Sequence, residues 1–508
     1  MSQIRADHLT FTYDGSTEPV FEDAVFTLDT DWKLGLIGRN GKGKTTLLRL
    51  LTGELSAQGT LTKSVPAAYF PYSVTPAQMQ RSAAEFAEEL RENCELWRVI
   101  CELSELHEDA EILYRPFRTL SLGQRTKVLL AILFSGENEF LLIDEPTNHL
   151  DAQARENVRQ YLSSKKGFIL VSHDRDLLDA CTDHILVLNR RTIMVQSGNF
   201  SCWQENQQRR DQFAEAENEK HRKQIRKLRQ AARRTAEWAD KSERTKIGFD
   251  PIKENDRCIS TRSFIGAKTK KMQSRVKNTE RRIERELNEQ EGLLQDIEEI
   301  AALKMSPLTH FKDTLVTLRD CSLQYAGAPA PMCKGLTFHV RQGERIALHG
   351  TNGCGKSTLM RLILQTAGVL PAEETLLVSG VCETASRLVI SYVPQDTSFL
   401  CGSIPAFCEE RGLDRSLFCT VLRQLDLSRA QLARDISEYS AGQKKKVLLA
   451  ASLLTPAHLY IWDEPLNFID IFSRMQIETL LETYRPTMLF AEHDIRFREN
   501  IATETICL

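Results

Sequence analysis

The sequence predicts an α/β protein in which two copies of one domain are joined by a long basic α-helical hairpin. Four sequence motifs recur in the same order in the N-terminal and C-terminal parts of the chain. Each copy alternates short apolar runs with helical patterns, as α/β domains do. The segment between the copies has almost no strand pattern. We therefore expect one domain over 1–200, a linker over 201–306 and a second domain over 307–508.

The internal repeat is too extensive to arise by chance. GRNGKGKTT from Gly38 matches GTNGCGKST from Gly350, and LSLGQRTKVLLA from Leu120 matches YSAGQKKKVLLA from Tyr439. Further along each copy, FLLIDEPTNHLD matches LYIWDEPLNFID, and ILVSHD matches LFAEHD. Apolar runs such as FLLI and LYIW, placed directly before loops, are typical of buried parallel strands. Both domains are therefore predicted to have the same fold.

A glycine-rich loop in each copy follows an apolar strand and leads into a helical pattern. This context is typical of a phosphate-binding loop, because glycines let backbone N–H groups surround phosphates at the positive end of a helix. The motif G-x-x-x-x-G-K-[ST] places Lys44 and Lys356 to reach the β- and γ-phosphates. Thr45 and Ser357 follow as candidate ligands of Mg²⁺.

Two acidic residues end a later apolar strand in each copy. Asp144 and Asp463 are placed to reach the magnesium ion, and Glu145 and Glu464 follow directly. A carboxylate at that point can orient or deprotonate an attacking water. His173 and His493 end another strand, and their recurrence favours a contact with the γ-phosphate over a purely structural role.

Composition excludes some classes of protein. The first residues, MSQIRADHLTF, are too polar for a signal peptide, and no apolar run approaches the ~18–20 residues of a membrane helix. The 13 cysteines are odd in number and scattered, without zinc-ligand spacing. They are expected to be free thiols in a reducing compartment. The sequence therefore predicts a cytoplasmic protein without a membrane part.

The net charge of −3 hides a strong asymmetry. Residues 220–285 hold 22 Lys or Arg and 8 Asp or Glu, a net charge of +14, so the rest of the chain carries −17. Glycine and proline interrupt the helical pattern near 246–267, which predicts two antiparallel helices with a turn there. A solvated spacer is the alternative interpretation. The charge favours binding to a polyanionic partner.

About 390 residues resemble the ATP-binding-cassette superfamily, whose distinguishing signature motif corresponds to LSLGQ at 120–124 and YSAGQ at 439–443. In that family the signature of one domain caps the γ-phosphate held by the other. The resemblance therefore implies two intramolecular composite sites, one on Lys44 and one on Lys356, and hydrolysis of ATP with Mg²⁺. The candidate ATP-binding residues are Tyr13, Gly38, Asn40, Gly41, Gly43, Lys44, Thr45, Thr46, Ser121, Gly123, Gln124, Tyr325, Gly350, Asn352, Gly353, Gly355, Lys356, Ser357, Thr358, Ser440, Gly442 and Gln443.

At several positions the sequence departs from the family pattern, or its match to the pattern has a second explanation. Tyr13 and Tyr325 occupy the position of the adenine-stacking aromatic, although ordinary packing explains a lone tyrosine equally well. The family's loop glutamine, a further candidate metal ligand, is Gln395 in the second copy but Tyr72 in the first. The third residue of the signature, a glycine in the family, is Leu122 in the first copy and Ala441 in the second. The position of His149 in the first copy is occupied by Phe468 in the second. Both glutamates are present, so hydrolysis at both sites is expected, with the first site cycling differently.

Two cassettes in one chain, no spanning segment and a basic linker resemble the ABC-F proteins, which bind the tRNA exit site of the ribosome. That resemblance implies a monomer that binds the bacterial 70S ribosome through rRNA and P-site tRNA, with neither DNA nor a membrane as partner. The linker would contact RNA phosphates by charge. A housekeeping translation factor, the ATPase subunit of a drug exporter and a DNA-repair cassette protein are the alternatives.

Within ABC-F, the stretches DTDWKLGLIGRNGKGKTTLLRLL and RSFIGAKTKKMQSRVKN resemble the Lsa-type antibiotic-resistance branch. The branch implies protection of ribosomes from lincosamides, pleuromutilins and A-type streptogramins, with the linker tip near the peptidyl-transferase centre. Phe264 is the expected tip residue, flanked by Arg262 and Lys268 as RNA contacts. A turn-packing role for Phe264 is equally compatible with the sequence.

Overall fold

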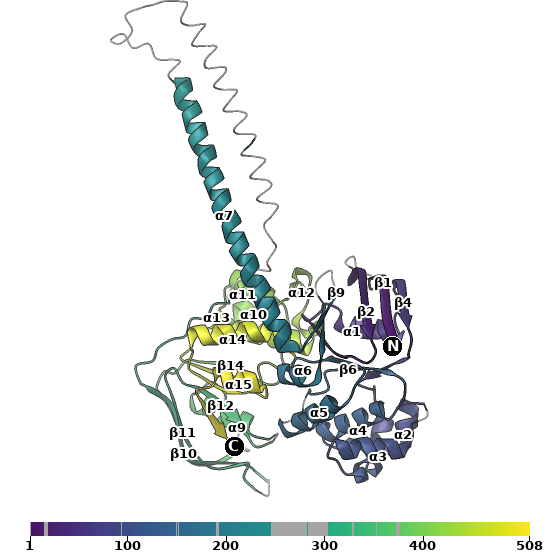
Figure 1. Ribbon diagram of the computed structural model, residues 1–508. Helices are drawn as coiled ribbons and strands as arrows, with labels where there is room; N and C mark the ends of the chain where they lie inside the picture. The colour runs from purple at the N-terminus through teal and green to yellow at the C-terminus, as the bar shows by residue number, and fades with distance from the viewer. Residues whose placement is uncertain are drawn as a thin grey trace, which may run out of the picture. The chain divides into compact units, whose positions relative to one another are not determined.

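The computed structural model of the chain describes residues 2–14, 19–92, 94–148, 150, 152–188, 193–244, 282, 303–327, 330–351, 353–371 and 376–508. Residues 1–203 and 301–508 together form one compact unit, and residues 204–300 form another. The first unit holds both repeats. The first repeat is coloured purple to blue in Figure 1, and the second is coloured green to yellow.

The first cassette contains two sheets. An antiparallel sheet has the order β2-β1-β4, and a larger sheet has the order β5-β6-β7-β3-β8-β9, parallel except for β9. Helices α2 to α4 and three short 3₁₀ helices lie beyond β5 in the sequence. The bounds are β1 Gln3–Phe11, β2 Phe21–Asp29, β3 Lys33–Gly38, α1 Lys44–Thr52, β4 Gln58–Lys63, β5 Ala67–Phe70, η1 Gln78–Gln80, α2 Ala83–Leu90, α3 Leu96–Glu105, η2 Ala110–Tyr114, η3 Phe117–Thr119, α4 Leu122–Phe134, β6 Phe140–Asp144, α5 Ala152–Ser164, β7 Phe168–Val171, α6 Arg175–Cys181, β8 His184–Leu188 and β9 Ile193–Ser197.

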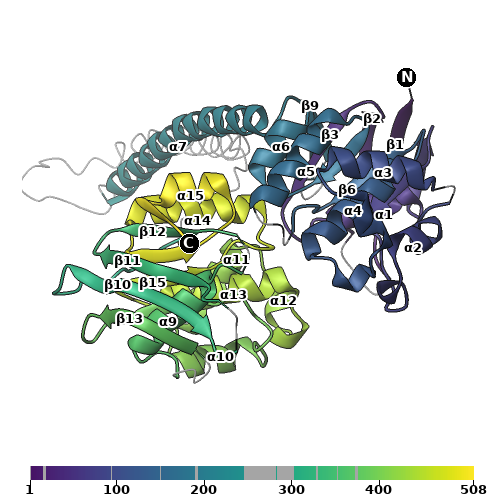
Figure 2. The same cartoon turned by 90° about the horizontal axis from the view of Figure 1, so that it is seen from below.

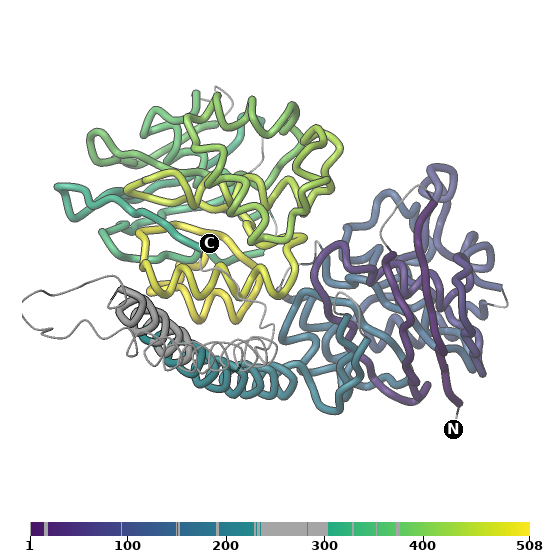
Figure 3. The backbone as a smooth tube through the Cα atoms, turned by 90° about the horizontal axis from the view of Figure 1, so that it is seen from above, coloured from purple at the N-terminus to yellow at the C-terminus, as the bar shows by residue number. Residues whose placement is uncertain are grey.

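The second cassette repeats this architecture. Its antiparallel sheet has the order β11-β10-β13, and its parallel sheet has the order β14-β15-β16-β12-β17, with β17 at one edge. Figure 3 follows the backbone of this cassette from green to yellow. The bounds are β10 Thr314–Tyr325, β11 Cys333–Arg341, β12 Arg345–His349, α9 Lys356–Thr366, β13 Leu376–Thr384, β14 Ile390–Val393, α10 Ile404–Arg411, α11 Arg415–Gln424, α12 Arg429–Leu432, η4 Ile436–Glu438, α13 Ala441–Leu454, β15 Leu459–Asp463, α14 Ile471–Tyr484, β16 Met488–Ala491, α15 Ile495–Ile501 and β17 Glu504–Cys507. The predicted α/β fold with two repeats is confirmed.

Central strands of the parallel sheets, such as β7 and β15, are buried on both faces, which explains their uninterrupted apolar sequences. In β15, Leu459 and Ile461 join one core cluster, while Tyr460 and Trp462 join another. Side chains of a strand alternate between its faces, so each face contributes to a separate core. Helix α9 packs on the face of Leu459, and helices α14 and α15 pack on the opposite face (Figure 2). Layering of this kind fixes the strand ends, and the loops that follow them, in space.

Trp462 is the largest side chain in this core. It is fully buried, and its indole Nε1 donates a hydrogen bond to Ser452 Oγ over 2.9 Å. We expect Trp462→Ala to lower the free energy of unfolding by about 3–5 kcal/mol, because it leaves a large cavity. Urea denaturation followed by circular dichroism measures this change. Trp97, which is 61% exposed, provides the control, and Trp97→Ala should change stability by less than about 0.5 kcal/mol.

The linker begins as one long helix, α7 (Phe200–Arg244), with 45 residues and therefore a length of about 68 Å (Figure 1). Phe200 and Trp203 at its start are buried in the core of the first unit. Along the helix, the side chains of Lys220, Arg222, Lys223, Arg226 and Lys227 are exposed. The predicted turn at 246–267, the second arm of the hairpin and the candidate RNA contacts Arg262, Phe264 and Lys268 lie outside the described residues.

Candidate nucleotide sites

Each glycine-rich loop closes around the amino group of its lysine. Lys44 Nζ donates hydrogen bonds to Gly38 O (2.6 Å) and to Asn40 Oδ1 (3.3 Å). Lys356 Nζ donates to Gly350 O (2.8 Å) and Thr351 O (2.9 Å). Helices α1 and α9 begin at these lysines, each preceded by a glycine with φ near 100°, a conformation that favours glycine. The two loops are called the first and second sites below.

A hydroxyl and a carboxylate meet beside each lysine. Thr45 Oγ1 donates to Asp144 Oδ2 over 3.2 Å, and Ser357 donates a hydrogen bond to Asp463. Asp463 Oδ1 is buried and has no hydrogen-bond partner among the described residues. Magnesium binds through one or two carboxylates plus substrate phosphates, so this donor set fits it. No group of three or more His, Cys, Asp and Glu side chains suited to a metal occurs in the described part of the chain.

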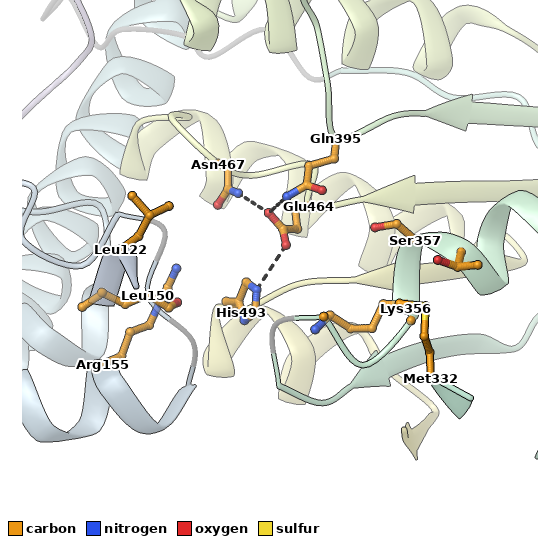
Figure 4. A pocket seen from close by; sticks show the side chains of 13 residues that line it. Leu122, Leu150, Arg155, Met332, Lys356, Ser357, Gln395, Glu464, Asn467 and His493 are labelled. Atoms are coloured by element: carbon orange, nitrogen blue, oxygen red, sulfur yellow. Dashed lines mark hydrogen bonds and ion pairs between the residues drawn. The ribbon is translucent and has the colours of Figure 1, made fainter. Parts of the chain in front are cut away.

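At the second site, Glu464 is held by three donors (Figure 4). Its Oε2 accepts hydrogen bonds from Gln395 Nε2 (2.8 Å) and Asn467 Nδ2 (2.6 Å). Its Oε1 lies 3.2 Å from His493 Nε2. Burial alone would raise the pKa of Glu464, but the bonds from His493 and Gln395 outweigh it, and the pKa is lowered. The carboxylate is therefore ionised at neutral pH.

At the first site, Glu145 is less well supported. His173 Nε2 lies 3.4 Å from Glu145 Oε1, but this oxygen has no hydrogen-bond partner among the described residues. Burial, followed by the neighbouring charge of Asp144, raises the pKa of Glu145 to about 8. Burial also lowers the pKa of His173 well below its usual value, so this imidazole is neutral. The two glutamates therefore differ in protonation at neutral pH.

Both glutamates have a left-handed backbone, with φ of 50° at Glu145 and 46° at Glu464. Non-glycine residues rarely adopt this conformation, and it occurs here at equivalent points of the two cassettes. The N–H of Glu145 donates to Val171 O over 2.9 Å, and that of Glu464 donates to Ala491 O over 3.0 Å. The neighbouring strand thus holds each glutamate in this strained conformation at the strand end.

A pocket of about 350 Å³ surrounds the second site and is lined by both cassettes. Figure 4 shows Leu122, Leu150 and Arg155 of the first cassette opposite Lys356, Ser357 and Glu464 of the second. Leu122 belongs to the signature at 120–124. The pocket therefore places Leu122 of the first signature opposite the second phosphate loop. Its lining residues are Leu122, Leu150, Arg155, Met332, Gly353, Gly355, Lys356, Ser357, Thr358, Gln395, Glu464, Asn467 and His493.

Each signature motif also caps the N-terminus of the helix that follows it. Ser121 Oγ accepts from Gln124 N (3.1 Å), and the Gln124 side chain accepts from Ser121 N (3.1 Å), which forms a capping box on α4. Ser440 and Gln443 form the same box on α13. The two glutamines of the signatures are thus engaged in shaping helix starts. A Cβ at Gly442 would lie 2.5 Å from Phe468 O, so glycine permits a close backbone approach there.

The candidate adenine-stacking tyrosines differ in their contacts. Tyr13 is 43% exposed, and its hydroxyl lies 2.8 Å from Thr46 Oγ1. The hydroxyl of Tyr325 lies 3.5 Å from Thr358 Oγ1. Both side chains therefore lie beside their phosphate-loop helices. Asn352 and His149 lie outside the described residues.

An asparagine and an arginine at the sites were not predicted from the sequence. Asn467 donates to Glu464, and Arg155 lines the pocket, with its Nε donating to Leu150 O over 3.0 Å. Arg474 makes the equivalent bond to Ile469 O over 2.9 Å. The signal was present, because asparagine follows DEPT and DEPL, and arginine recurs four residues after each repeated aspartate. A comparison of the two copies residue by residue would have found them.

Two further observations concern the chain as a whole. Among the described residues, no helix has the combined length and apolar character needed to cross a bilayer. The cysteines of the described part of the chain are all free thiols, as the sequence predicts.

Paired phosphate loops, strand-end carboxylates and an opposing signature define a nucleotide hydrolase of the cassette type. The profile of the ABC transporter family matches residues 21–148 and 333–467, which is just over half of the chain. The chain therefore belongs to the ABC transporter family of ATP-binding proteins, and it is an ATP hydrolase.

Similar proteins span nearly the whole chain. The ribosome protection protein VmlR of Bacillus subtilis (strain 168) is 28% identical over 502 residues, covering 98% of this chain and 85% of that protein. The erythromycin resistance ATP-binding protein MsrA of Staphylococcus epidermidis is 26% identical over 502 residues, covering 92% of this chain and 90% of that protein. These matches confirm the predicted resemblance to ABC-F proteins. The archaeal ribosome recycling factor aABCE1, solved with the ribosomal stalk protein aP1, shares the fold, with a TM-score of 0.58 at 19% identity over 98% of this chain and 87% of that chain.

Proposed function

We propose that this chain is a cytoplasmic, ribosome-associated ATPase of the ABC-F type that protects the bacterial 70S ribosome from antibiotics. Its relatives support this proposal, because one is named as a ribosome protection protein and another as an erythromycin resistance protein. Both align across the linker as well as the cassettes. The chain acts as a monomer that pairs its own cassettes, with neither DNA nor a membrane as partner.

In the proposed reaction, each phosphate loop binds one ATP, and the signature of the other cassette caps it. Lys356 neutralises the phosphates of the second site, while Ser121 and Gly123 complete it. Glu464 takes the proton of the attacking water, and Gln395, Asn467 and His493 hold that carboxylate in place. Ser357 and Asp463, with Gln395 as a further candidate ligand, would hold Mg²⁺, which would neutralise charge on the phosphates when bound. The equivalent residues of the first site are Lys44, Thr45, Asp144, Glu145, His173, Ser440 and Gly442, but Tyr72 replaces its loop glutamine.

In this proposal, the linker makes the contacts with the RNA of the ribosome. ATP pairs the cassettes, and the closed form fits the vacant tRNA exit site. The basic hairpin then extends toward the P-site tRNA and the peptidyl-transferase centre. Arg262 and Lys268 contact RNA, and Phe264 approaches the pocket for lincosamides, pleuromutilins and A-type streptogramins. Hydrolysis separates the paired cassettes and releases the protein from the ribosome.

Charge reversal on the linker tests ribosome binding. Changing the exposed Lys220, Arg222, Lys223, Arg226 and Lys227 to Glu should weaken co-sedimentation with 70S ribosomes at least tenfold, since each lost phosphate contact removes counterion release. The matched control reverses five exposed charges of the second cassette, at Lys312, Arg319, Lys334, Arg415 and Arg434. Equal binding by both variants would contradict the proposal.

Growth assays separate resistance from the alternatives. Expression in a susceptible host should raise the inhibitory concentrations of the three drug classes. A housekeeping factor would leave them unchanged and alter translation instead. Fractionation with membranes, without co-sedimentation with ribosomes, would favour the exporter subunit.

The pKa difference between the glutamates predicts a pH dependence. In Glu464→Gln, the residual hydrolysis depends on Glu145, whose pKa is raised to about 8. The base acts when deprotonated, so its active fraction rises from about 10% at pH 7 to about 90% at pH 9, roughly ninefold. The residual ATPase rate of this variant should rise accordingly. Glu145→Gln relies on Glu464, whose pKa is lowered, and should show no such rise.

A further inference from the structure

Two cysteines of the second cassette meet at its phosphate loop. Cys354 lies within the loop, between Gly353 and Gly355. Cys333, the first residue of β11, is buried, and its Sγ donates a hydrogen bond to Cys354 O over 2.8 Å. A Cβ added to Gly355 would lie 2.7 Å from Cys333 Sγ, so this thiol packs directly against the backbone of the loop. The two cysteines, 21 residues apart in sequence, are therefore in contact in the folded chain.

The corresponding positions of the first cassette carry no thiol. Phe21, the first residue of β2, occupies the place of Cys333, and Lys42 occupies the place of Cys354 in the repeated loop. A Cβ added to Gly43 would lie 2.9 Å from the ring of Phe21, so the packing of the strand against the loop is kept. Because phenylalanine and lysine have no sulfur to oxidise, the first site is a control within the same chain.

The surroundings of the two thiols suit different steps of an oxidation. Cys354 is partly buried, and its Sγ lies 3.9 Å from Lys356 Nζ, so a thiolate at Cys354 would form beside a positive charge. Gly353 and Gly355, on either side of it, line the pocket of the second site, through which a small oxidant can approach. Burial, followed by the neighbouring Cys354, raises the pKa of Cys333, so this thiol keeps its proton at neutral pH. Cys354 is therefore suited to react first, and Cys333 is suited to react second.

We propose that Cys333 and Cys354 form a reversible disulfide that blocks the second ATP site when hydrogen peroxide is present. The Cys354 thiolate attacks one peroxide oxygen, which gives a sulfenic acid and a hydroxide, and the hydroxide takes up the proton that Cys354 lost. The Cys333 thiol then attacks the sulfenic sulfur, and the sulfenic hydroxyl leaves with the thiol proton as a second water. The two thiols together lose two electrons, and one peroxide is reduced to two waters. The proposal concerns ATP binding and is independent of ribosome binding.

The disulfide changes the shape of the phosphate loop. Cys354 Sγ packs against Gly350, where an added Cβ would lie 2.6 Å from the sulfur, whereas Cys333 Sγ contacts the carbonyl of Cys354. Residue 354 must therefore turn its sulfur away from Gly350 and toward β11 before the two sulfurs can bond. Gly353 and Gly355, with φ of 84° and 102°, give the loop the backbone freedom for this turn. The N–H groups of the turned loop no longer converge on the phosphates, so the second site loses its ATP.

Peroxide treatment of the purified chain tests the disulfide without ribosomes. After treatment and removal of the peroxide, peptide mass spectrometry should find residues 333 and 354 in one linked peptide. Binding of labelled ATP should fall from about two to about one molecule per chain, because each phosphate loop holds one ATP and only the second loop is blocked. Dithiothreitol should restore the lost ATP, which separates the disulfide from unfolding. A wild-type chain without the linked peptide, or with Cys333 linked to the buried Cys321 instead, would overturn the proposal.

Serine variants assign the two steps. Each variant is compared with and without peroxide, so a change in its basal ATP binding does not enter the comparison. Cys354→Ser should keep its ATP after peroxide treatment, and Cys333→Ser should accumulate a sulfenic acid at Cys354, which dimedone traps. Cys401→Ser, which removes an exposed thiol elsewhere in the second cassette, should respond like the wild type. Equal loss of ATP from the wild type and Cys354→Ser, or dimedone found on Cys333 instead of Cys354, refutes the assignment of Cys354 as the attacking thiol.

Discussion

Replacing both Glu145 and Glu464 by glutamine should lower the steady-state ATPase rate by about 10²–10⁴ and should leave ATP binding intact. Glutamine preserves the size of the side chain but cannot accept the proton of the attacking water. The variant should therefore remain in the ATP-bound, paired state. Because the proposed function attributes ribosome binding to that state, the variant should accumulate on 70S ribosomes when ATP is present. Co-sedimentation and a phosphate-release assay measure the two effects.

The controls separate trapping from misfolding. Replacing both Lys44 and Lys356 by alanine removes the ammonium groups that lie within the phosphate loops. That variant should bind ATP poorly and should not accumulate on ribosomes. A double glutamine variant that binds ATP but stays in the supernatant would contradict the proposed function. A double glutamine variant that hydrolyses ATP at the wild-type rate would contradict the assignment of the catalytic base.

Asp470→Ala should cause one of the largest losses of stability in the second cassette, about 3–5 kcal/mol. Asp470 is fully buried, and its Oδ2 accepts from Lys446 Nζ over 2.7 Å. Its Oδ1 also accepts from Ser473 N over 2.9 Å at the start of α14. The substitution therefore leaves the buried Lys446 ammonium without its counter-charge and removes a helix cap. Urea unfolding at pH 7 measures the loss.

The same carboxylate predicts a response to acid. Burial alone would raise the pKa of Asp470, but the charge and hydrogen bond of Lys446 outweigh it and lower the pKa below its usual value. The unfolded chain then takes up a proton at higher pH than the folded chain does. The stability from Asp470 is therefore present above the ordinary carboxyl pKa and is lost as the pH falls below it. Asp470→Ala should lose less stability than the wild type on acidification.

Asp414 provides a control for the capping contribution alone. It caps the exposed start of α11, where its Oδ1 accepts from Leu417 N over 2.8 Å. Asp414→Ala should cost about 1 kcal/mol, because a cap is lost and no buried charge is left unpaired. If the two variants lose similar free energy, the Lys446–Asp470 pair contributes little.

Local patterns identified the parts of the site that lie close together in sequence. The spacing of glycines, lysine and hydroxyl predicted the loops around Lys44 and Lys356, since that chemistry requires a strand, a turn and a helix in succession. The acidic pair at 463–464 was found because buried parallel strands end in loops at one edge of the sheet. The repeats predicted two equivalent folds, and the structure confirms them.

Contacts between distant segments were beyond this reasoning. No local pattern shows that Lys445 bonds Pro394 O, since 51 residues separate them. Nor does the sequence show that Arg39 pairs with Asp426, which lies 387 residues away. The replacement of a glutamine by Tyr72 was visible in the sequence, but the hydrogen bond of Tyr72 with Arg91 was not.

The sequence by itself determined the two-cassette α/β fold, the phosphate loops and the charge of the linker, because each follows from residues within one strand–loop–helix unit or from composition. Only the tertiary structure decided how the two sites differ. Burial and hydrogen bonding set whether Glu145 and Glu464 hold a proton, and both depend on side chains that distant segments bring to the strand ends.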